Sequence, residues 1–143
     1  MKFTYQEMPC EPSEAFPKMR TAFRPVIPVT IRNGTYKVEV FALIDSGADF
    51  CVFPSEACLV LGIDECSGKK TPVQGVGRSV SVTYYHEVEM EIAGHKMPLY
   101  VGFTSVPIPL LGQIGFFDRW CVKMDYGQKS IEITPRKLSV VRK

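Results

Sequence analysis

One stretch of the sequence decides the fold: Phe41-Ala42-Leu43-Ile44-Asp45-Ser46-Gly47-Ala48-Asp49. Four apolar residues lead directly into a carboxylate. An ionised carboxylate is rarely placed at the inner end of a buried strand, because desolvation disfavours its charge. The plain interpretation is a turn that ends the strand, since Asp, Ser and Gly are common turn formers. The alternative is a functional carboxylate held at the edge of a core.

The residues before this stretch predict a β-hairpin. Residues 26–31 are mostly apolar and β-branched, and Asn33-Gly34 separates them from a second β-rich run over residues 35–44. Asn-Gly between two such runs is the strongest short-range hairpin signal, because both residues tolerate positive φ. Apolar and polar residues alternate from Tyr36 to Val40 and then give way to a wholly apolar end, so we expect the second strand to enter the core there.

The rest of the chain predicts more strands than helices. We expect strands over residues 50–53, 79–92, 96–103, 121–125 and 130–134, and short helices over residues 54–61 and near 115–119. Pro54 suits a first helical turn, and Gly62 suits the end of that helix. Residues 1–24 predict a mostly irregular lead-in, with one strand over residues 2–8. The fold class is therefore all-β with one or two short helices.

Composition and charge narrow the classes of function. The chain has 143 residues, 45% of them hydrophobic, and a net charge of +2, which suits a single globular domain and offers no basic face for nucleic acid. No segment predicts a signal peptide or a membrane span. The five cysteines form no Cys/His cluster with zinc-site spacing, so we expect reduced thiols, no metal or other cofactor, and a cytoplasmic location.

Three motifs together resemble those of the retroviral-type aspartic peptidases, the retropepsins. The stretch around Asp45-Ser46-Gly47 is similar to their active-site signature, and Ile108-Pro109-Leu110-Leu111-Gly112 resembles the segment that crosses behind the catalytic loop. Between the two, Gly75-Val76-Gly77 stands where this family has its flap hairpin. The resemblance covers roughly residues 25–135 and implies a closed, acid-protease-type β-barrel of a single lobe with a flap.

The chemistry implied by this resemblance needs two carboxylates. Two carboxyl groups that share one proton have separated pKa values, so that one can activate water while the other protonates the leaving amine. The chain contains one Asp-Ser/Thr-Gly sequence only, since Asp64, Asp118 and Asp125 lack the residues that follow. The second carboxylate must then come from Asp45 of another copy, which predicts a homodimer that cleaves an extended peptide or protein substrate.

The resemblance also implies roles for the neighbouring residues. Asp45 would be the catalytic residue. The acidic residue at position 49 often pairs in this family with an Arg that stands here as Gln113, so a substrate-facing Asp49 is as good an expectation as a structural one. The remaining assignments are support of the active site by Ser46, Gly47 and Ala48, the flap at Gly75, Val76, Gly77 and Arg78, and the segment behind the site at Leu110, Leu111 and Gly112.

Two alternative functions stay open, and so does the role of the C-terminal tail. A retropepsin-like dimer with a poorly formed cleft would serve as a peptide-binding scaffold, and a monomeric barrel with an accidental turn motif would have no such site. We divide the chain into the lead-in, residues 1–24, the protease domain, residues 25–135, and a basic tail, residues 136–143. The tail is a candidate strand for the dimer interface, although a frayed end is equally consistent with its composition.

Overall fold

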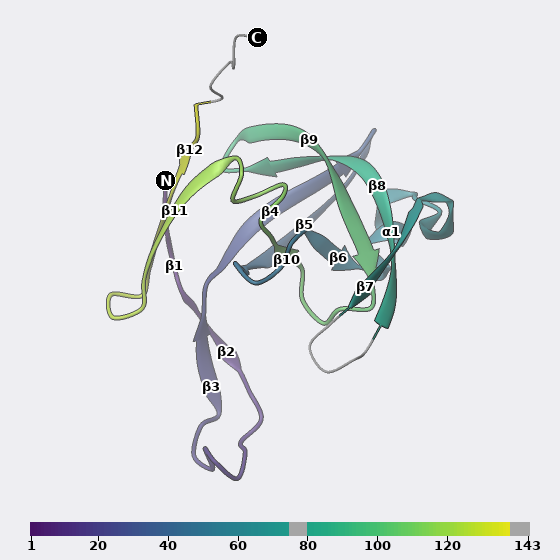
Figure 1. Ribbon diagram of the computed structural model, residues 1–143. Coiled ribbons are helices and arrows are strands. Elements are labelled where there is room, and N and C mark those ends of the chain that lie inside the picture. The colour runs from purple at the N-terminus through teal and green to yellow at the C-terminus, as the bar shows by residue number, and fades with distance from the viewer. Residues whose placement is uncertain (75–79, 138–143) are drawn as a thin grey trace.

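The computed structural model describes residues 1–74 and 80–137, and it confirms the all-β class (Figure 1). One short α-helix and one 3-10 helix accompany the strands. The elements are β1 (Lys2–Thr4), β2 (Gln6–Pro9), β3 (Thr21–Arg24), β4 (Val26–Asn33), β5 (Tyr36–Ile44), β6 (Val52–Pro54), α1 (Glu56–Leu61), η1 (Glu65–Ser67), β7 (Lys69–Gln74), β8 (Val80–Ile92), β9 (His95–Thr104), β10 (Leu110–Leu111), β11 (Trp120–Asp125) and β12 (Ser130–Pro135).

Six strands close into a barrel, as the resemblance implied. Their order is β4-β5-β10-β6-β9-β8, and β8 returns to pair with β4, while β7 pairs with the other part of β8. The barrel is mixed, because β10 runs parallel to β5 and β6 runs parallel to β9. Closure leaves no open edge along most of the barrel wall.

The hairpin of β4 and β5 forms as expected, with its loop one residue further along the chain. Asn33 pairs with Tyr36, so the two-residue loop consists of Gly34 and Thr35. Gly34 adopts φ 59°, a conformation that other residues rarely adopt. Asn33 instead uses its side-chain amide to donate to the Leu61 carbonyl at 2.9 Å, which ties the hairpin to the end of α1.

The apolar end of β5 enters the core on one face only. Ala42 and Ile44 are buried, whereas Phe41 is 54% exposed. The expectation that the whole run from residue 41 to 44 is buried is therefore wrong at Phe41, because side chains along a strand keep alternating between its two faces. The inward face continues up to the last residue before Asp45.

Side chains from every wall of the barrel fill its interior. Trp120 and Phe116 belong to this core, as do Ile131 and Ile133 of β12. The largest fully buried side chains are Trp120, Phe53, Phe103, Phe116, Ile27, Ile31, Leu61, Met90, Ile92, Leu111, Ile131 and Ile133. The core thus extends beneath the three-stranded sheet β1-β12-β11, which covers one side of the barrel.

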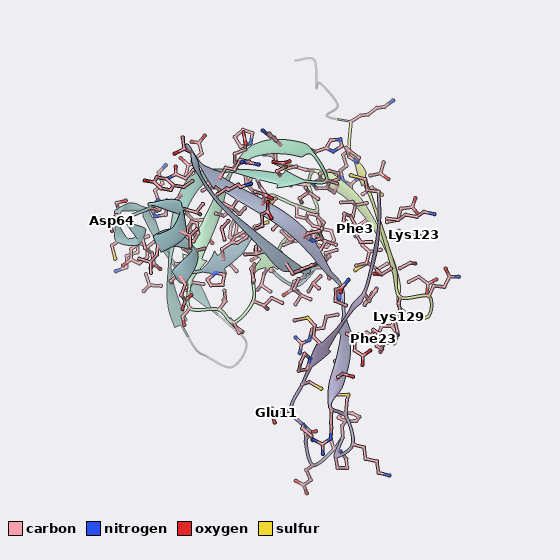
Figure 2. All side chains as sticks on the ribbon, turned by 180° about the vertical axis from the view of Figure 1, so that it is seen from behind. Phe3, Glu11, Phe23, Asp64, Lys123 and Lys129 are labelled. Atoms are coloured by element: carbon pink, nitrogen blue, oxygen red, sulfur yellow. The ribbon has the colours of Figure 1, made fainter. Side chains whose placement is uncertain are left out.

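The lead-in is more regular than the sequence predicted. The strand expected over residues 2–8 is present as β1 and β2, and β2 pairs with β3, a strand that was not predicted. Pro12 and Pro17 lie in the loop between these two strands. They therefore do not prevent the residues on either side of the loop from forming strands. Figure 1 shows the β2–β3 hairpin projecting away from the barrel, and Figure 2 shows Phe23 beside Lys129 at its base.

One predicted helix is present and one is not. The helix α1 ends at Gly62, which adopts φ 63° as a left-handed cap, as its sequence predicted. The helix expected near residues 115–119 is wrong: this segment is a series of turns, and Gly115 has φ 102°, outside the helical region. No helix in the described part of the chain is long and apolar enough to cross a membrane.

Candidate active site

Asp45 follows the last residue of β5 and lies where the strand leaves the core. Its backbone N–H donates to the carbonyl of Leu111 at 3.0 Å, so the position of its Cα is set by a neighbouring strand. The Asp45 side chain is half-buried, whereas Ser46 and Gly47 are exposed. The buried end of β5 therefore delivers a carboxylate to the surface of the domain.

The segment around β10 supports this loop from behind. Leu110 and Leu111 pair in parallel with Leu43 and Ile44. Past the strand, the N–H of Gln113 donates to the Ala48 carbonyl at 2.8 Å. The same register continues with a bridge between Ile114 and Phe50. Backbone contacts thus run along the loop on both sides of Asp45, which gives the loop a defined conformation.

Gly112 is required for this close approach. A Cβ atom at this position would lie 2.4 Å from the Phe50 carbonyl oxygen and 2.7 Å from that of Ala48. Both neighbours are backbone atoms, and the Ala48 carbonyl also accepts the hydrogen bond from Gln113, so they cannot move aside cheaply. The placement of Leu110, Leu111 and Gly112 behind the loop is the arrangement that the resemblance implied.

The Asp45 carboxylate is oriented by its own loop. The N–H of Gly47 donates to Asp45 Oδ1 at 2.9 Å, so this glycine contacts the carboxylate directly. The N–H of Ala48 donates to the Asp45 carbonyl at 3.2 Å and closes the turn. The side chain is therefore fixed in direction while the loop around it stays open to solvent.

Gln113 takes over a structural role that an ion pair would have filled. Its side-chain amide donates to the Ser46 carbonyl at 2.7 Å, a contact between two segments 67 residues apart. Asp49 is exposed, and its carboxylate accepts no hydrogen bond from the described residues. Asp49 is thus available for contacts outside its own chain, and Gln113 ties the crossing segment to the loop directly.

Cys51 is a component of the site that the sequence did not reveal. Its buried thiol donates to the Ile114 carbonyl at 3.6 Å and accepts from the Gly112 N–H at 3.4 Å. Burial raises the pKa of the Cys51 thiol to about 11. A neutral, enclosed thiol fits a packing role and not redox control. The clue in the sequence was its position, two residues after Asp49.

The structure describes the ribbon that leads to the predicted flap, though not its tip. Strands β7 and β8 pair from Lys69 opposite Tyr85 to Gln74 opposite Val80. Gly75, Val76, Gly77 and Arg78 lie outside the described residues. The paired strands β7 and β8 therefore stand on either side of the predicted flap, and the roles of these four residues stay a prediction.

Comparisons with known proteins agree with this geometry. The family model described as aspartyl protease matches residues 27–113, a segment that runs from β4 to Gln113 and includes the Asp45 loop and the crossing segment. Among solved structures, the EIAV protease, complexed with the inhibitor HBY-793, is similar with a TM-score of 0.52 and 25% identity, covering 63% of this chain and 82% of that chain. No curated protein sequence matches the chain significantly. The chain belongs to the aspartyl protease family and has its single-lobed, retropepsin-like form.

Proposed function

We propose that this protein is an aspartic endopeptidase whose active form is a homodimer, with Asp45 of each copy as the catalytic carboxylate. One observation carries the proposal: backbone contacts fix the Asp45 loop from behind, while Ser46 and Gly47 remain exposed in front. A loop held in this way leaves its exposed side available to a second copy of the chain. Membership of the aspartyl protease family supports the same class of chemistry.

The reaction would use the two carboxylates as one unit. Like charges at close range cannot both stay ionised, so the pair holds one proton between them, and the pKa values belong to the pair. The ionised carboxylate takes a proton from a water that attacks the peptide carbonyl. The protonated one donates to that carbonyl oxygen and, as the tetrahedral intermediate breaks down, a proton passes to the leaving amine. No covalent bond forms between substrate and protein.

An extended peptide is the substrate class that this architecture favours. The β7–β8 ribbon lies on the same barrel as the Asp45 loop, and a strand-like peptide can add its backbone hydrogen bonds to such a ribbon. We propose that residues 75–78 close over the bound peptide and that Ser46 bonds across the dimer axis. All five cysteines are free thiols, which favours the cytoplasm as the compartment where the enzyme acts.

Replacing Asp45 by Asn tests the assignment with little change in shape. We expect Asp45→Asn to lower kcat/KM on a cleaved peptide by at least about a thousandfold, while the melting temperature and the dimer fraction stay close to the wild type. Mass spectrometry of a peptide library after incubation supplies the substrates. Undiminished cleavage by this variant would refute the assignment.

Pepstatin separates the peptidase from the scaffold alternative. Its hydroxyl group imitates the tetrahedral intermediate, so a competent pair of carboxylates should bind it much more tightly than a pair of amides does. We expect wild-type protein to bind pepstatin in calorimetry and Asp45→Asn to lose most of that affinity. Peptide binding without cleavage, with pepstatin affinity unchanged by the substitution, would favour the scaffold.

A further inference from the structure

The β2–β3 hairpin takes no part in the reaction described above. Its two strands pair only with each other, and no residue between 6 and 24 belongs to the hydrophobic core of the described chain. Figure 1 and Figure 2 both show the hairpin projecting away from the barrel. A two-stranded hairpin is marginally stable in water unless another surface covers it. The described residues of its own chain contact it only near its base, so we looked for a surface that covers the rest.

Contacts at the base fix the direction in which the hairpin projects. The ammonium group of Lys129 lies 2.9 Å from the ring centroid of Tyr126 and 4.8 Å from that of Phe23 in β3. The N–H of Tyr5, which precedes β2, donates to the Lys129 carbonyl at 2.9 Å. Cation–π contacts of this kind are stabilising. The hairpin is therefore oriented before it meets a partner, which lowers the entropy lost on binding.

The tip of the hairpin presents two large apolar side chains from an ordered loop. Phe16 is 61% exposed and Met19 is 42% exposed. The N–H of Phe16 donates to the Ser13 hydroxyl at 3.1 Å, and the N–H of Met19 donates to the Phe16 carbonyl at 3.2 Å. Single exposed apolar residues are common, but aromatic residues and methionine are enriched in protein interfaces. Their place together at the end of a projecting hairpin favours an interface anchor.

The base of the hairpin borders the surface through which two copies would meet. β3 ends at Arg24, and the carbonyl of the next residue, Pro25, accepts a hydrogen bond from the Ile44 N–H at 2.9 Å, directly before Asp45. The exposed front of the Asp45 loop consists of a few residues, whereas a stable interface takes about 20–30 residues from each partner. The hairpin adjoins this loop and can supply the additional surface, which favours a second copy of the chain as its partner.

A hollow between β1 and the outer face of the barrel offers a surface for the tip. Its volume is about 470 Å³, enough for an aromatic side chain. Its apolar walls are Phe3, Val26, Pro28 and Phe41. Gln6, at the base of the hairpin, also lines this hollow, and the paired strands, roughly 13 Å long, separate that base from the tip. Phe16 of the same chain therefore does not reach the hollow.

Two-fold symmetry would bring the tip of one copy to the hollow of the other. Hairpin and hollow both border the Asp45 end of β5, the hairpin through Pro25 and the hollow through Phe41. Phe41 stands four residues before Asp45, which is roughly 13 Å of strand and close to the length of the hairpin. If the two Asp45 loops meet at the axis, each hairpin extends past the axis by about the distance at which the other hollow begins.

We propose that the β2–β3 hairpin is a dimerisation arm, with Phe16 of each copy packed into the hollow beside Phe41 of the other copy. Two identical contacts would then lie on either side of the paired Asp45 loops, as a two-fold axis requires. The proposal rests on the proposed peptidase function, because it names the surface that brings the two halves of that active site together.

The dissociation constant of the dimer tests the arm. It is measured by sedimentation in the Asp45→Asn background, so that no cleavage is needed. Phe16→Ser and Phe41→Ser should each raise it at least about tenfold. The double variant should exceed the single ones by no more than about threefold, because both changes remove the same contact. Leu59→Ser is the control, since Leu59 is 85% exposed on α1 and does not line the hollow, and it should change the constant less than about twofold.

Two results would overturn the arm. One is a dissociation constant that Phe16→Ser leaves unchanged or raises no more than Leu59→Ser does. The other comes from a photoreactive benzoylphenylalanine at position 16, tested in a mixture of ¹⁵N-labelled and unlabelled chains. Cross-linked peptides should join a labelled to an unlabelled chain in the segment around Phe41. Cross-links confined to one chain would contradict the proposal, and melting temperatures confirm that each variant is folded.

Activity assays distinguish failure of the arm from failure of the peptidase assignment. Phe16→Ser in the otherwise wild-type protein should lose most peptide cleavage at low protein concentration and regain it well above the dissociation constant of this variant. A dimer that depends on Phe16 and cleaves no peptide would support the arm and contradict the peptidase. Cleavage with an unaffected dimer would do the opposite. A loss of cleavage that persists at high concentration, with the dimer unchanged, would place Phe16 against substrate and overturn the arm.

Discussion

Gln113 shows how a single residue can carry the support that a charged pair would otherwise give. It joins the crossing segment to the active-site loop through one side-chain hydrogen bond, to the Ser46 carbonyl at 2.7 Å. The sequence showed that the ion pair was missing. It could not show the replacement, because that contact depends on where an amide group 67 residues away comes to lie in three dimensions.

Removal of this amide should loosen the loop without unfolding the domain. We expect Gln113→Ala to lower the free energy of unfolding by about 1 kcal/mol and to lower kcat/KM several-fold, because the Asp45 carboxylate is then less well oriented. Urea titration and peptide kinetics measure the two effects. Gln128→Ala is the control, since Gln128 is also exposed and its side chain makes no hydrogen bond to the described residues. Equal effects in both variants would remove Gln113 from this role.

The Cys51 thiol makes stability depend on pH in a predictable direction. Its pKa is about 11 in the folded protein against 9.0 for an ordinary thiol, so the unfolded chain loses this proton first as the pH rises. The stabilisation is therefore complete below pH 9 and is lost between about pH 9 and 11. We expect the wild type to lose roughly 2–3 kcal/mol more over this interval than Cys51→Ala does. Parallel pH curves for the two proteins would contradict this.

Residues with local signatures could be predicted, and residues defined by distant contacts could not. Turns and close contacts between backbone segments require particular residue types, so they can be recognised in the sequence. Examples are the Asp45-Ser46-Gly47 motif and the glycines Gly34, Gly62 and Gly112. Other features join segments that are far apart in the sequence and that only the barrel brings together. These are the hydrogen bonds of the Cys51 thiol with Gly112 and Ile114, and the cavity lined by Phe50, Tyr85 and Tyr100.

At the level of elements, the crossing segment around β10 is the part that determines the geometry of the site. It is short, only Leu110–Leu111, and yet it lies between β5 and β6 and continues along the loop to Ile114. Its position in the sequence could be recognised because a short apolar run there ends in a glycine. Its parallel register with β5 required the structure.

Gly112→Ala should disrupt this element more than a substitution of the side chain of Leu110 or Leu111. The added Cβ would meet two backbone carbonyls, at 2.4 and 2.7 Å, so either the loop or β10 must shift. We expect a loss of at least about 2 kcal/mol in unfolding free energy, together with loss of peptidase activity. At Gly127 the nearest atom to an added Cβ is a side-chain oxygen at 3.3 Å, so Gly127→Ala serves as the control. Similar stability of the two variants would show that the crossing is less tight than described.

Other elements show where sequence patterns mislead. Proline-rich segments suggested an irregular lead-in, but the prolines occupy only the loop and the end of a hairpin, and β2 and β3 pair around them. Four apolar residues suggested a fully buried end of β5, but Phe41 faces outward. The first error arose because the composition of a segment does not show that a partner strand is present. The second arose because an apolar run in a strand still alternates between two faces.

At the level of the whole molecule, one copy of this chain has one Asp-Ser-Gly loop and therefore one candidate catalytic carboxylate. The barrel, the crossing segment and the β7–β8 ribbon form a single lobe. Membership of the aspartyl protease family supports the proposed chemistry, and the single Asp-Ser-Gly motif is the reason why we propose that two copies act together. The sequence predicted this architecture well because the motifs that place the loop are local. The sheet β1-β12-β11 and the projecting β2–β3 hairpin came only from the structure.

If the active site is shared between two subunits, neither copy of Asp45 can act alone. Wild-type protein and Asp45→Asn protein are unfolded together in different proportions, refolded at a constant total concentration, and assayed with one peptide substrate. If two carboxylates are needed, activity follows the square of the wild-type share, so one part wild type with three parts variant retains about one sixteenth of the activity. Activity that falls in direct proportion, to about one quarter in that mixture, would contradict a site shared by two subunits, because each subunit would then be working without a partner's carboxylate.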